Sequence, residues 1–509
     1  MIPDATYASE VRRALDAADY TERGVVERLG CGETLRLTPR ERPRLLRRTQ
    51  HATPLDTFIR LFLVEAEVSE AEARRAVAPT PLDAWSDSGL LIAYEGRVAA
   101  GFALLPQLGL RLLFDLRTHR PLRADHVVGM GPVSNMLSWA TVRARVGRAL
   151  DVGTGCGGQA LLLARHAERV VATDVNPRAL EVAAFNAALN GIDNVELRRG
   201  SLFEPVVGEE FDLVVANPPF AIGPNQELAF RDGGFPADGF VERIVREAPT
   251  HLRSGGHCQL TAHWAQLQGE EWRARLARWV EGSGCDAWVL RLKTVGPETY
   301  AAGWITETEQ PEPEVYERRW KEWVGYLERE RIEAIGNGVV NLRRRPSGEG
   351  RFWVLDDLEE LDAEAGDAIA EGFAVRELLA STPDEALLEM ALRIGPGVRL
   401  ESASESRGEG WEVTGAVLRR RRGLHFSASV DGAMANLVGR CDGIRTLRAL
   451  ARELAEGLGS DLPKLVTSLL PLVRGLVERG FLLPAAEGLK AAEASRPASG
   501  SPSRATVGI

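Results

Sequence analysis

Hydrophobic positions change their spacing along the chain, and these changes predict where its elements lie. Up to about residue 85, apolar residues recur at helical spacing, which predicts helices at 9–19, 38–50, 54–67 and 69–76. Between residues 89 and 115 they alternate with polar residues or run together between turn residues, which predicts a small sheet. Residues 1–124 are therefore expected to form an N-terminal accessory domain, with helices followed by a small sheet.

Short apolar runs dominate the next part of the chain. Strands are predicted at 149–152, 170–173, 194–197, 211–216 and 257–262, and helices at 159–167 and 239–251. The first of these strands runs into a turn rich in glycine, Gly153-Thr154-Gly155-Cys156-Gly157-Gly158, which opens a helix. Glycines at this spacing allow a tight turn and a close approach of the backbone to a nucleotide.

An acid follows the second strand. Asp174 stands where a ribose-binding carboxylate is expected, one strand after the glycine-rich turn. A site for NAD and a site for S-adenosylmethionine would both have this pattern. The turn after strand 211–216 favours the second, because a dehydrogenase has no need of a rigid amide acceptor there.

That turn is Asn217-Pro218-Pro219-Phe220. Asn217 and Pro218 each precede a proline and are pushed toward extended backbone, while each proline fixes its own φ at about −65°. The Asn217 amide oxygen and the Pro218 carbonyl oxygen can then accept hydrogen bonds from one NH₂ group. Phe220 offers a ring face to a flat substrate, a contact worth roughly 1–3 kcal/mol when the partner is a base. The alternative is an ordinary turn at the end of a strand.

With these motifs, residues from 125 to about 256 resemble the class I S-adenosylmethionine-dependent methyltransferases, in particular the subgroup with an Asn-Pro-Pro-aromatic motif. Members of that subgroup methylate exocyclic amines of adenine or guanine in nucleic acids, or the side-chain amide of glutamine in release factors. The resemblance implies an α/β fold with a Rossmann-like, seven-stranded mixed sheet. Segments 288–294 and 339–345 would be its closing antiparallel pair.

The resemblance also implies roles for individual residues. Asp151 and the backbone of Gly153 and Gly155 would hold the methionine part of S-adenosylmethionine. Asp174 would bind the ribose hydroxyls, and the Leu202 N–H would meet the adenine ring, beside Ser201, where many relatives carry an acid. The expected cofactor-binding residues are Asp151, Gly153, Thr154, Gly155, Cys156, Gly157, Asp174, Val175, Asn176, Ser201, Leu202 and Asn217, and the expected catalytic residues are Asn217, Pro218 and Phe220. No metal is expected.

The remaining patterns divide the chain into domains. The methyltransferase domain is expected at 125–345, with an insertion helix at 312–332 whose aromatic stripe is interpreted as a packing face. Glycines at 129–131 suggest a loop that closes over the cofactor, with a plain linker as the alternative, and glycines at 233–234 suggest a substrate lid. Residues 346–484 are predicted to form a winged-helix-like α+β domain, with helices at 433–440, 446–458 and 464–478 and a final strand at 481–483. Residues 485–509 are predicted to be disordered.

Composition sets limits on function. No apolar run approaches the length of a membrane span, and five scattered cysteines show neither metal-site nor disulfide spacing, so a cytoplasmic protein is expected. The net charge of −10 argues against a uniformly basic nucleic-acid binder. Arginines nevertheless cluster at 36–48, 343–345 and 419–422, where they could contact phosphates or pair with neighbouring acids.

Three functions remain open at this stage, with a NAD oxidoreductase as a distant fourth. A nucleic-acid amine methyltransferase is favoured, with RNA or DNA preferred over protein as the partner, because Phe220 and the flanking domains suit an unstacked base. A protein glutamine methyltransferase would use the same acceptor turn. A non-catalytic regulator that binds S-adenosylmethionine and works through the winged helix is the third. The oligomeric state stays open.

Overall fold

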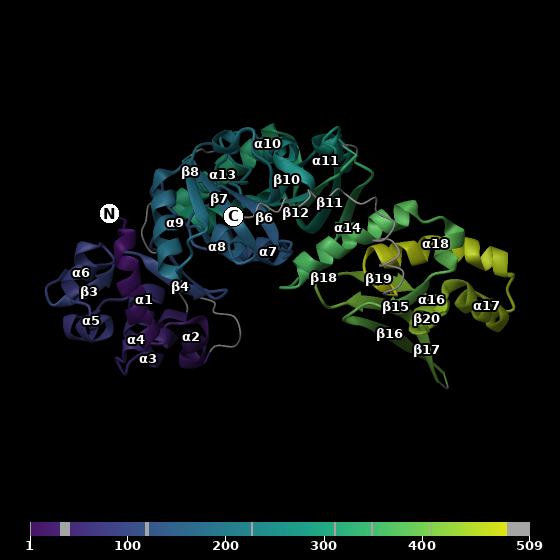
Figure 1. Cartoon of the computed structure of the whole chain (residues 1–509), viewed down its shortest axis with the longest axis horizontal. Helices are drawn as coiled ribbons and strands as arrows, with labels where there is room; N and C mark the ends of the chain where they lie inside the picture. Colours follow the sequence, from purple (N-terminus) through teal and green to yellow (C-terminus); the bar gives the residue numbers. More distant parts are fainter. Residues whose placement is uncertain are drawn as a thin grey trace, which may run out of the picture. The chain divides into compact units, whose positions relative to one another are not determined.

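The computed structural model describes residues 2–30, 41–117, 122–224, 227–309, 312–347, 350–408 and 410–485. The chain divides into two compact units, Met1–Asp356 and Asp357–Ile509 (Figure 1). Among the described residues, no helix is long and apolar enough to cross a membrane.

An eight-stranded mixed sheet forms the centre of the first unit. Its order is β8-β7-β6-β9-β10-β12-β11-β13, in which β6 to β10 run parallel and β12 runs antiparallel to both β10 and β11. The strands are β6 (Val146–Val152), β7 (Ala167–Asp174), β8 (Val195–Arg199), β9 (Phe211–Ala216), β10 (Leu252–Leu267), β11 (Cys285–Val295), β12 (Ile332–Arg344) and β13 (Trp353–Asp357). The predicted closing pair is therefore β11 and β12.

The predicted count of seven strands is wrong, because β13 adds an eighth at the edge of the sheet. Its sequence was assigned to the C-terminal domain. In the structure, Ala287 on β11 donates its N–H to the carbonyl oxygen of Phe352 at 3.0 Å. The Trp288 indole N–H also donates to Asp356 at 3.0 Å. An apolar run predicts a strand, but not the sheet edge that the strand joins.

Helices cover both faces of this sheet (Figure 1). On one face, α10 (Gly239–Glu247) and α11 (Trp272–Val280) bury Ile244 and Trp279 against Leu150. On the other, α8 (Gly158–Leu163) buries Leu163 against Ala149. Ala149 and Leu150 are neighbours on β6, so they point to opposite faces and both are buried.

The N-terminal segments follow the predicted pattern of helices and then short strands. The helices are α1 (Ala8–Ala17), α2 (Glu22–Leu29), α3 (Arg42–Arg48), α4 (Pro54–Phe58), α5 (Glu70–Val77) and α6 (Leu82–Asp87), with a π-helical turn at Ile59–Leu63. The strands are β1 (Val68–Ser69), β2 (Leu91–Tyr94), β3 (Arg97–Ala100), β4 (Ala103–Gln107) and β5 (Leu110–Phe114). The predicted start of the second helix, residue 38, lies outside the described residues.

Asn186 joins this N-terminal part to the sheet domain. It lies on α9 (Pro177–Asn190) and is 0% exposed. Its Oδ1 accepts from the Leu113 N–H at 2.7 Å, and its Nδ2 donates to the carbonyl oxygens of Leu113 and Cys156 at 2.9 and 2.8 Å. One side chain therefore connects strand β5 to the glycine-rich turn.

The second unit contains the helices and the final strand that the pattern predicts near its end. They are α16 (Gly432–Gly439), α17 (Leu447–Leu458), α18 (Leu462–Glu478) and β21 (Leu482–Pro484). The pattern missed α14 (Ala365–Ser381), which has no clear apolar stripe, and β16 (Val398–Arg407), which is largely polar. The other elements are β14 (Glu360–Leu361), α15 (Asp384–Leu388), β15 (Ala391–Ile394), β17 (Gly410–Arg420), β18 (Leu424–His425), β19 (Ser427–Val430) and β20 (Asp442–Thr446). The winged-helix interpretation stays a prediction.

Asn186→Ala should lower the free energy of unfolding of the first unit by about 2–4 kcal/mol, because it leaves buried backbone groups of Leu113 and Cys156 without partners. Urea denaturation followed by tryptophan fluorescence measures this loss. Glu181→Ala, at an exposed position of the same helix, is the matched control and should change the free energy by less than about 0.5 kcal/mol. Equal effects of the two substitutions would contradict the role given to Asn186.

Candidate active site

The glycine-rich turn leaves β6 at its carboxyl end with its backbone facing open space. Gly153, Gly155 and Gly157 have φ of +74°, +55° and +85°, a region that favours glycine. A Cβ built on Gly153 or Gly155 would meet no atom within 4 Å. The space beside these two residues therefore suits a ligand that approaches the backbone, as a nucleotide-type cofactor does.

Asp174, the last residue of β7, closes one side of this turn. Its Oδ2 accepts from the Gly155 N–H at 2.8 Å, and its Oδ1 accepts from the Asn176 N–H at 2.9 Å. Burial raises the pKa of Asp174. Each carboxylate oxygen can accept more than one hydrogen bond, so both can still receive hydroxyl groups.

Asp151 faces into the turn. It is 1% exposed, and its Oδ2 accepts from Thr154 Oγ1 at 2.6 Å and from the Ala160 N–H at 3.0 Å. Burial raises the pKa of Asp151 to about 7. Thr154 and Cys156 are also buried, and burial raises the pKa of the Cys156 thiol to about 11. These three side chains shape the turn.

The other expected cofactor residues lie at the same edge of the sheet. Asn176 caps α9 and donates from Nδ2 to the Asp125 carbonyl oxygen at 3.0 Å, while Val175 is 60% exposed. Leu202 follows β8 with a left-handed φ of +49° and is held by Thr173, whose hydroxyl donates to its carbonyl oxygen at 3.3 Å. Ser201 donates its N–H to Glu204 at 3.2 Å.

Asn217 follows β9, and two hydroxyl groups orient its amide. Thr261 Oγ1, on β10, donates to Asn217 Oδ1 at 2.6 Å. Asn217 Nδ2 donates to Ser134 Oγ at 2.9 Å, in the first turn of α7 (Pro132–Ala140). The amide oxygen keeps a lone pair for a further donor. The loop at 129–131 thus leads into a helix that contacts the predicted acceptor.

Phe220 packs in a cluster with His263, Tyr300 and Trp304, which we call the aromatic corner. The ring centroids of His263 and Trp304 lie 4.3 and 6.2 Å from that of Phe220. His263 Nδ1 lies 2.8 Å from the Tyr300 hydroxyl, which also accepts the Ile222 N–H at 3.0 Å. Tyr300 and Trp304 come from α12 (Pro297–Trp304), far from the turn in sequence. Pro218, within the turn, is buried.

The sequence-based prediction missed Ser134, Thr261, His263, Tyr300 and Trp304. A signal existed for two of them, because Gln259, Thr261 and His263 alternate with apolar residues on β10. Alternate residues of a strand share one face, so this polar face could have been recognised. No local pattern marks the contacts of α7 and α12.

The loop after the turn is fixed by Arg231, which is 1% exposed. Its guanidinium donates to both carboxylate oxygens of Asp232, at 2.7 and 3.0 Å, and to Thr308 Oγ1 at 2.9 Å. It also lies 5.5 Å from the Trp323 ring on α13 (Pro313–Arg329). Trp323 and Leu327 are 0% exposed, so the aromatic stripe of this helix is a packing face. The loop proposed as a substrate lid is anchored at Arg231.

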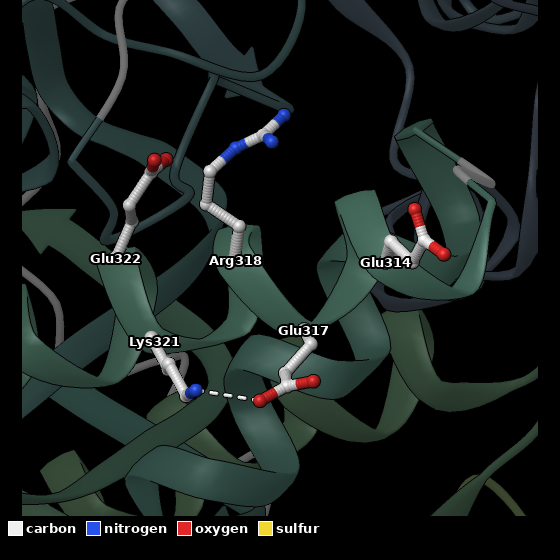
Figure 2. A pocket seen from close by; sticks show the side chains of 5 residues that line it. All are labelled: Glu314, Glu317, Arg318, Lys321 and Glu322. Atoms are coloured by element: carbon white, nitrogen blue, oxygen red, sulfur yellow. Dashed lines mark hydrogen bonds and ion pairs between the residues drawn. The ribbon is translucent and has the colours of Figure 1, made fainter.

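A hollow elsewhere in the surface is lined by none of the candidate site residues described above. It lies along α13 and is lined by Glu314, Glu317, Arg318, Lys321 and Glu322. Figure 2 shows Lys321 directed at Glu317, with which it forms an ion pair at 2.5 Å. Charged side chains of one helix face line it, and the aromatic corner is the better candidate for a substrate site.

Residues 133–272 match the family described as methyltransferase small domain. This stretch contains the glycine-rich turn, Asp174 and Asn217. Residues 133–272 form a methyltransferase small domain. The expected class I methyltransferase core and its cofactor, S-adenosylmethionine, are confirmed at the level of this domain. Residues 17–101 and 370–484 match two further families, both described as domains of unknown function (DUF7059 and DUF7782).

Similar proteins include two curated methyltransferases. A release factor glutamine methyltransferase from Xylella fastidiosa is 37% identical over 131 residues, which are 23% of this chain and 48% of that protein. A ribosomal protein uL3 glutamine methyltransferase from Bradyrhizobium diazoefficiens is 39% identical over 146 residues, 26% of this chain and 44% of that protein. The chain therefore spans about half the length of these relatives. A solved methyltransferase structure from Pyrococcus furiosus is 19% identical, covers 47% of this chain and 91% of that chain, and has a TM-score of 0.29.

The expected preference for RNA or DNA over protein as the partner of the methyltransferase domain is wrong. Both relatives are named for glutamine methylation, and one name specifies a release factor and the other a ribosomal protein. The described arginine clusters agree with this correction. Each cluster has an arginine that pairs with an acid of its own unit, namely Arg44, Arg345 and Arg419. Residues 36–40 of the first cluster lie outside the described residues.

Asp151 should make stability depend on pH. Its pKa of about 7 in the folded chain exceeds the value of about 3.9 for an unfolded Asp, so between these pH values the folded chain binds more protons. Stability therefore falls as pH rises. Relative to Asp151→Asn, the wild-type free energy of unfolding should fall from pH 5 to pH 7, with a slope approaching about 1.4 kcal/mol per pH unit.

Urea denaturation at several pH values measures this difference. Asp193→Asn, at an exposed position, is the control and should keep the wild-type dependence. The same pH dependence in wild type and Asp151→Asn would contradict the burial argument.

Proposed function

We propose that this protein is an S-adenosylmethionine-dependent N-methyltransferase that acts on the side-chain amide of a glutamine in a protein. The observation that carries the proposal is the Asn217 amide, which Thr261 and Ser134 orient with its oxygen available to a further donor. The glutamine methyltransferases to which the domain is similar support the class of acceptor.

The residues around the glycine-rich turn fit S-adenosylmethionine. Asp174 would accept the ribose hydroxyls, and the open backbone at Gly153 and Gly155 would lie against the methionine part. Ser201 and Leu202, at the end of the next strand, would flank the adenine. When bound, the sulfonium supplies a methyl group that is already activated for transfer to a nucleophile.

The protein then has to present the amide nitrogen. Asn217 Oδ1 and the Pro218 carbonyl oxygen accept its two hydrogens and turn the lone pair away from the amide plane. With S-adenosylmethionine bound, the nitrogen would take the methyl group as the bond from that group to sulfur breaks. Asn217 Oδ1 and the Pro218 carbonyl oxygen would hold the two N–H hydrogens until one proton leaves to solvent when the product is released. Positive charge builds on nitrogen during this step, and two fixed acceptors stabilise it by about 2.7–4 kcal/mol each, by analogy with oxyanion holes.

Phe220 and Trp304 form apolar walls beside these acceptors. A glutamine amide is flat, so it can lie against the Phe220 ring while its NH₂ group reaches the turn. Apolar walls also exclude water, which strengthens the hydrogen bonds within the site. A regulator without catalytic activity would not need an acceptor group held by two hydroxyls.

Asn217→Ala should lower kcat by about 10²–10³-fold, because it removes one fixed acceptor from the transition state. Its affinity for S-adenosylmethionine, measured by isothermal titration calorimetry, should stay within about twofold. Asp174→Ala is the matched comparison and should mainly weaken cofactor binding, by about tenfold or more. If Asn217→Ala weakened cofactor binding as much as turnover, the acceptor role would be wrong.

Thr261→Val should lower kcat by about tenfold or more while the affinity for the cofactor stays unchanged, because the Asn217 amide loses the donor that fixes its orientation. Valine has nearly the same shape as threonine and fits the buried position of Thr261, so the fold should persist. Thr250→Val, at an exposed helix end, is the control and should keep full activity. Wild-type turnover in Thr261→Val would rule out a positioning role for this hydroxyl.

The function itself is tested by incubating the full chain with methyl-labelled S-adenosylmethionine and, separately, a release factor, ribosomal protein uL3, RNA and DNA from its host. Label on a glutamine of either protein is the expected result. Label only on a nucleic acid, or no label together with tight cofactor binding, would contradict the proposal.

A further inference from the structure

His263 lies in the aromatic corner, and one of its ring nitrogens is hydrogen-bonded to Tyr300. Its Nδ1 is 2.8 Å from the Tyr300 hydroxyl. Its ring contacts Phe220 at 4.3 Å and Trp304 at 6.2 Å. Thr261, which orients Asn217, lies two residues earlier on β10 and therefore on the same face of the sheet. His263 and the acceptor turn thus border one space.

The contacts of Tyr300 favour one of the two neutral forms of the His263 ring. The Tyr300 oxygen accepts the Ile222 N–H at 3.0 Å, and we assign its own hydrogen to the 2.8 Å contact with His263 Nδ1. A neutral imidazole whose Nδ1 accepts carries its hydrogen on Nε2. Burial lowers the pKa of His263 to about 3, which keeps the ring neutral at physiological pH. His263 is therefore a hydrogen-bond donor through Nε2.

We propose that His263 determines specificity by donating its Nε2–H to the carbonyl oxygen of the acceptor glutamine. This inference rests on the proposed function. A primary amide presents two N–H donors and one carbonyl acceptor, and Asn217 with Pro218 can satisfy only the donors. A carbonyl oxygen left without a partner beside these rings would weaken binding, and His263 supplies that partner.

The same hydrogen bond decides which atom of the amide is methylated. The oxygen is the more nucleophilic atom of a neutral amide, and a donor on its lone pairs masks it. The nitrogen, held by Asn217 and Pro218, is then the atom directed toward the methyl group. An acceptor amine without a neighbouring carbonyl would gain nothing from His263.

Two substitutions separate donation from packing. His263→Phe keeps an aromatic ring beside Phe220 but removes the donor, and His263→Gln restores an N–H donor. With full-length protein and the release factor or uL3 as probe, whichever the wild type methylates, kcat/KM should fall by roughly 10- to 100-fold in the Phe variant. It should recover at least in part in the Gln variant. Cofactor affinity, measured by calorimetry, should stay within about twofold in both.

Full activity of His263→Phe, or equal losses in both variants, would overturn the donor role while leaving the proposed function intact. Failure of the wild type to methylate either protein is a different result and would count against the proposed function itself. Methylation of an adenine in RNA by the wild type would overturn both, because the donor would then face a ring nitrogen.

Discussion

The amide of Asn217 is held between two hydroxyl groups, and the arrangement of the site depends on that pair of hydrogen bonds. The hydroxyl of Thr261, on β10, donates to Asn217 Oδ1 at 2.6 Å. The hydroxyl of Ser134, on α7, accepts from Asn217 Nδ2 at 2.9 Å. An amide accepts through its oxygen and donates through its nitrogen. A donor on one side and an acceptor on the other therefore allow only one orientation of the Asn217 amide. Helix α7 connects the same residue to the cofactor turn, since Gln159 Nε2 donates to the Ser134 carbonyl oxygen at 2.6 Å.

A second set of contacts forms the substrate side of the site, which is the part around Phe220 and the loop after the acceptor turn. Arg231 lies buried between the loop that follows the acceptor turn and the π-helical segment Ile305–Glu309, so the loop and the segment after α12 are tied together. Tyr300 bonds both to that loop and to His263. The segment between β11 and β12 therefore builds one wall of the site.

Much of the cofactor side could be predicted from the sequence, because its signals are local. Glycines with positive φ, an acid at a strand end and a proline-locked turn each depend on neighbours in the chain. The substrate side could not, because Ser134, Trp304 and Tyr300 reach Asn217, Phe220 and His263, respectively, only through the fold. The eighth strand shows the same limit, because no local pattern marks β11 as the neighbour of β13. The preference for nucleic acid rested on Phe220 and on the flanking domains, and an aromatic ring suits a flat amide equally well.

The central claim is that Asn217 is an acceptor oriented before the substrate arrives. A crystal structure of the full chain with S-adenosylhomocysteine and a glutamine peptide from the methylated protein tests it most directly. The account predicts the glutamine amide nitrogen at about 2.7–3.2 Å from Asn217 Oδ1, with the Thr261 hydrogen bond retained. A glutamine nitrogen out of reach of Asn217, or an Asn217 amide that has rotated away from Thr261, would contradict it.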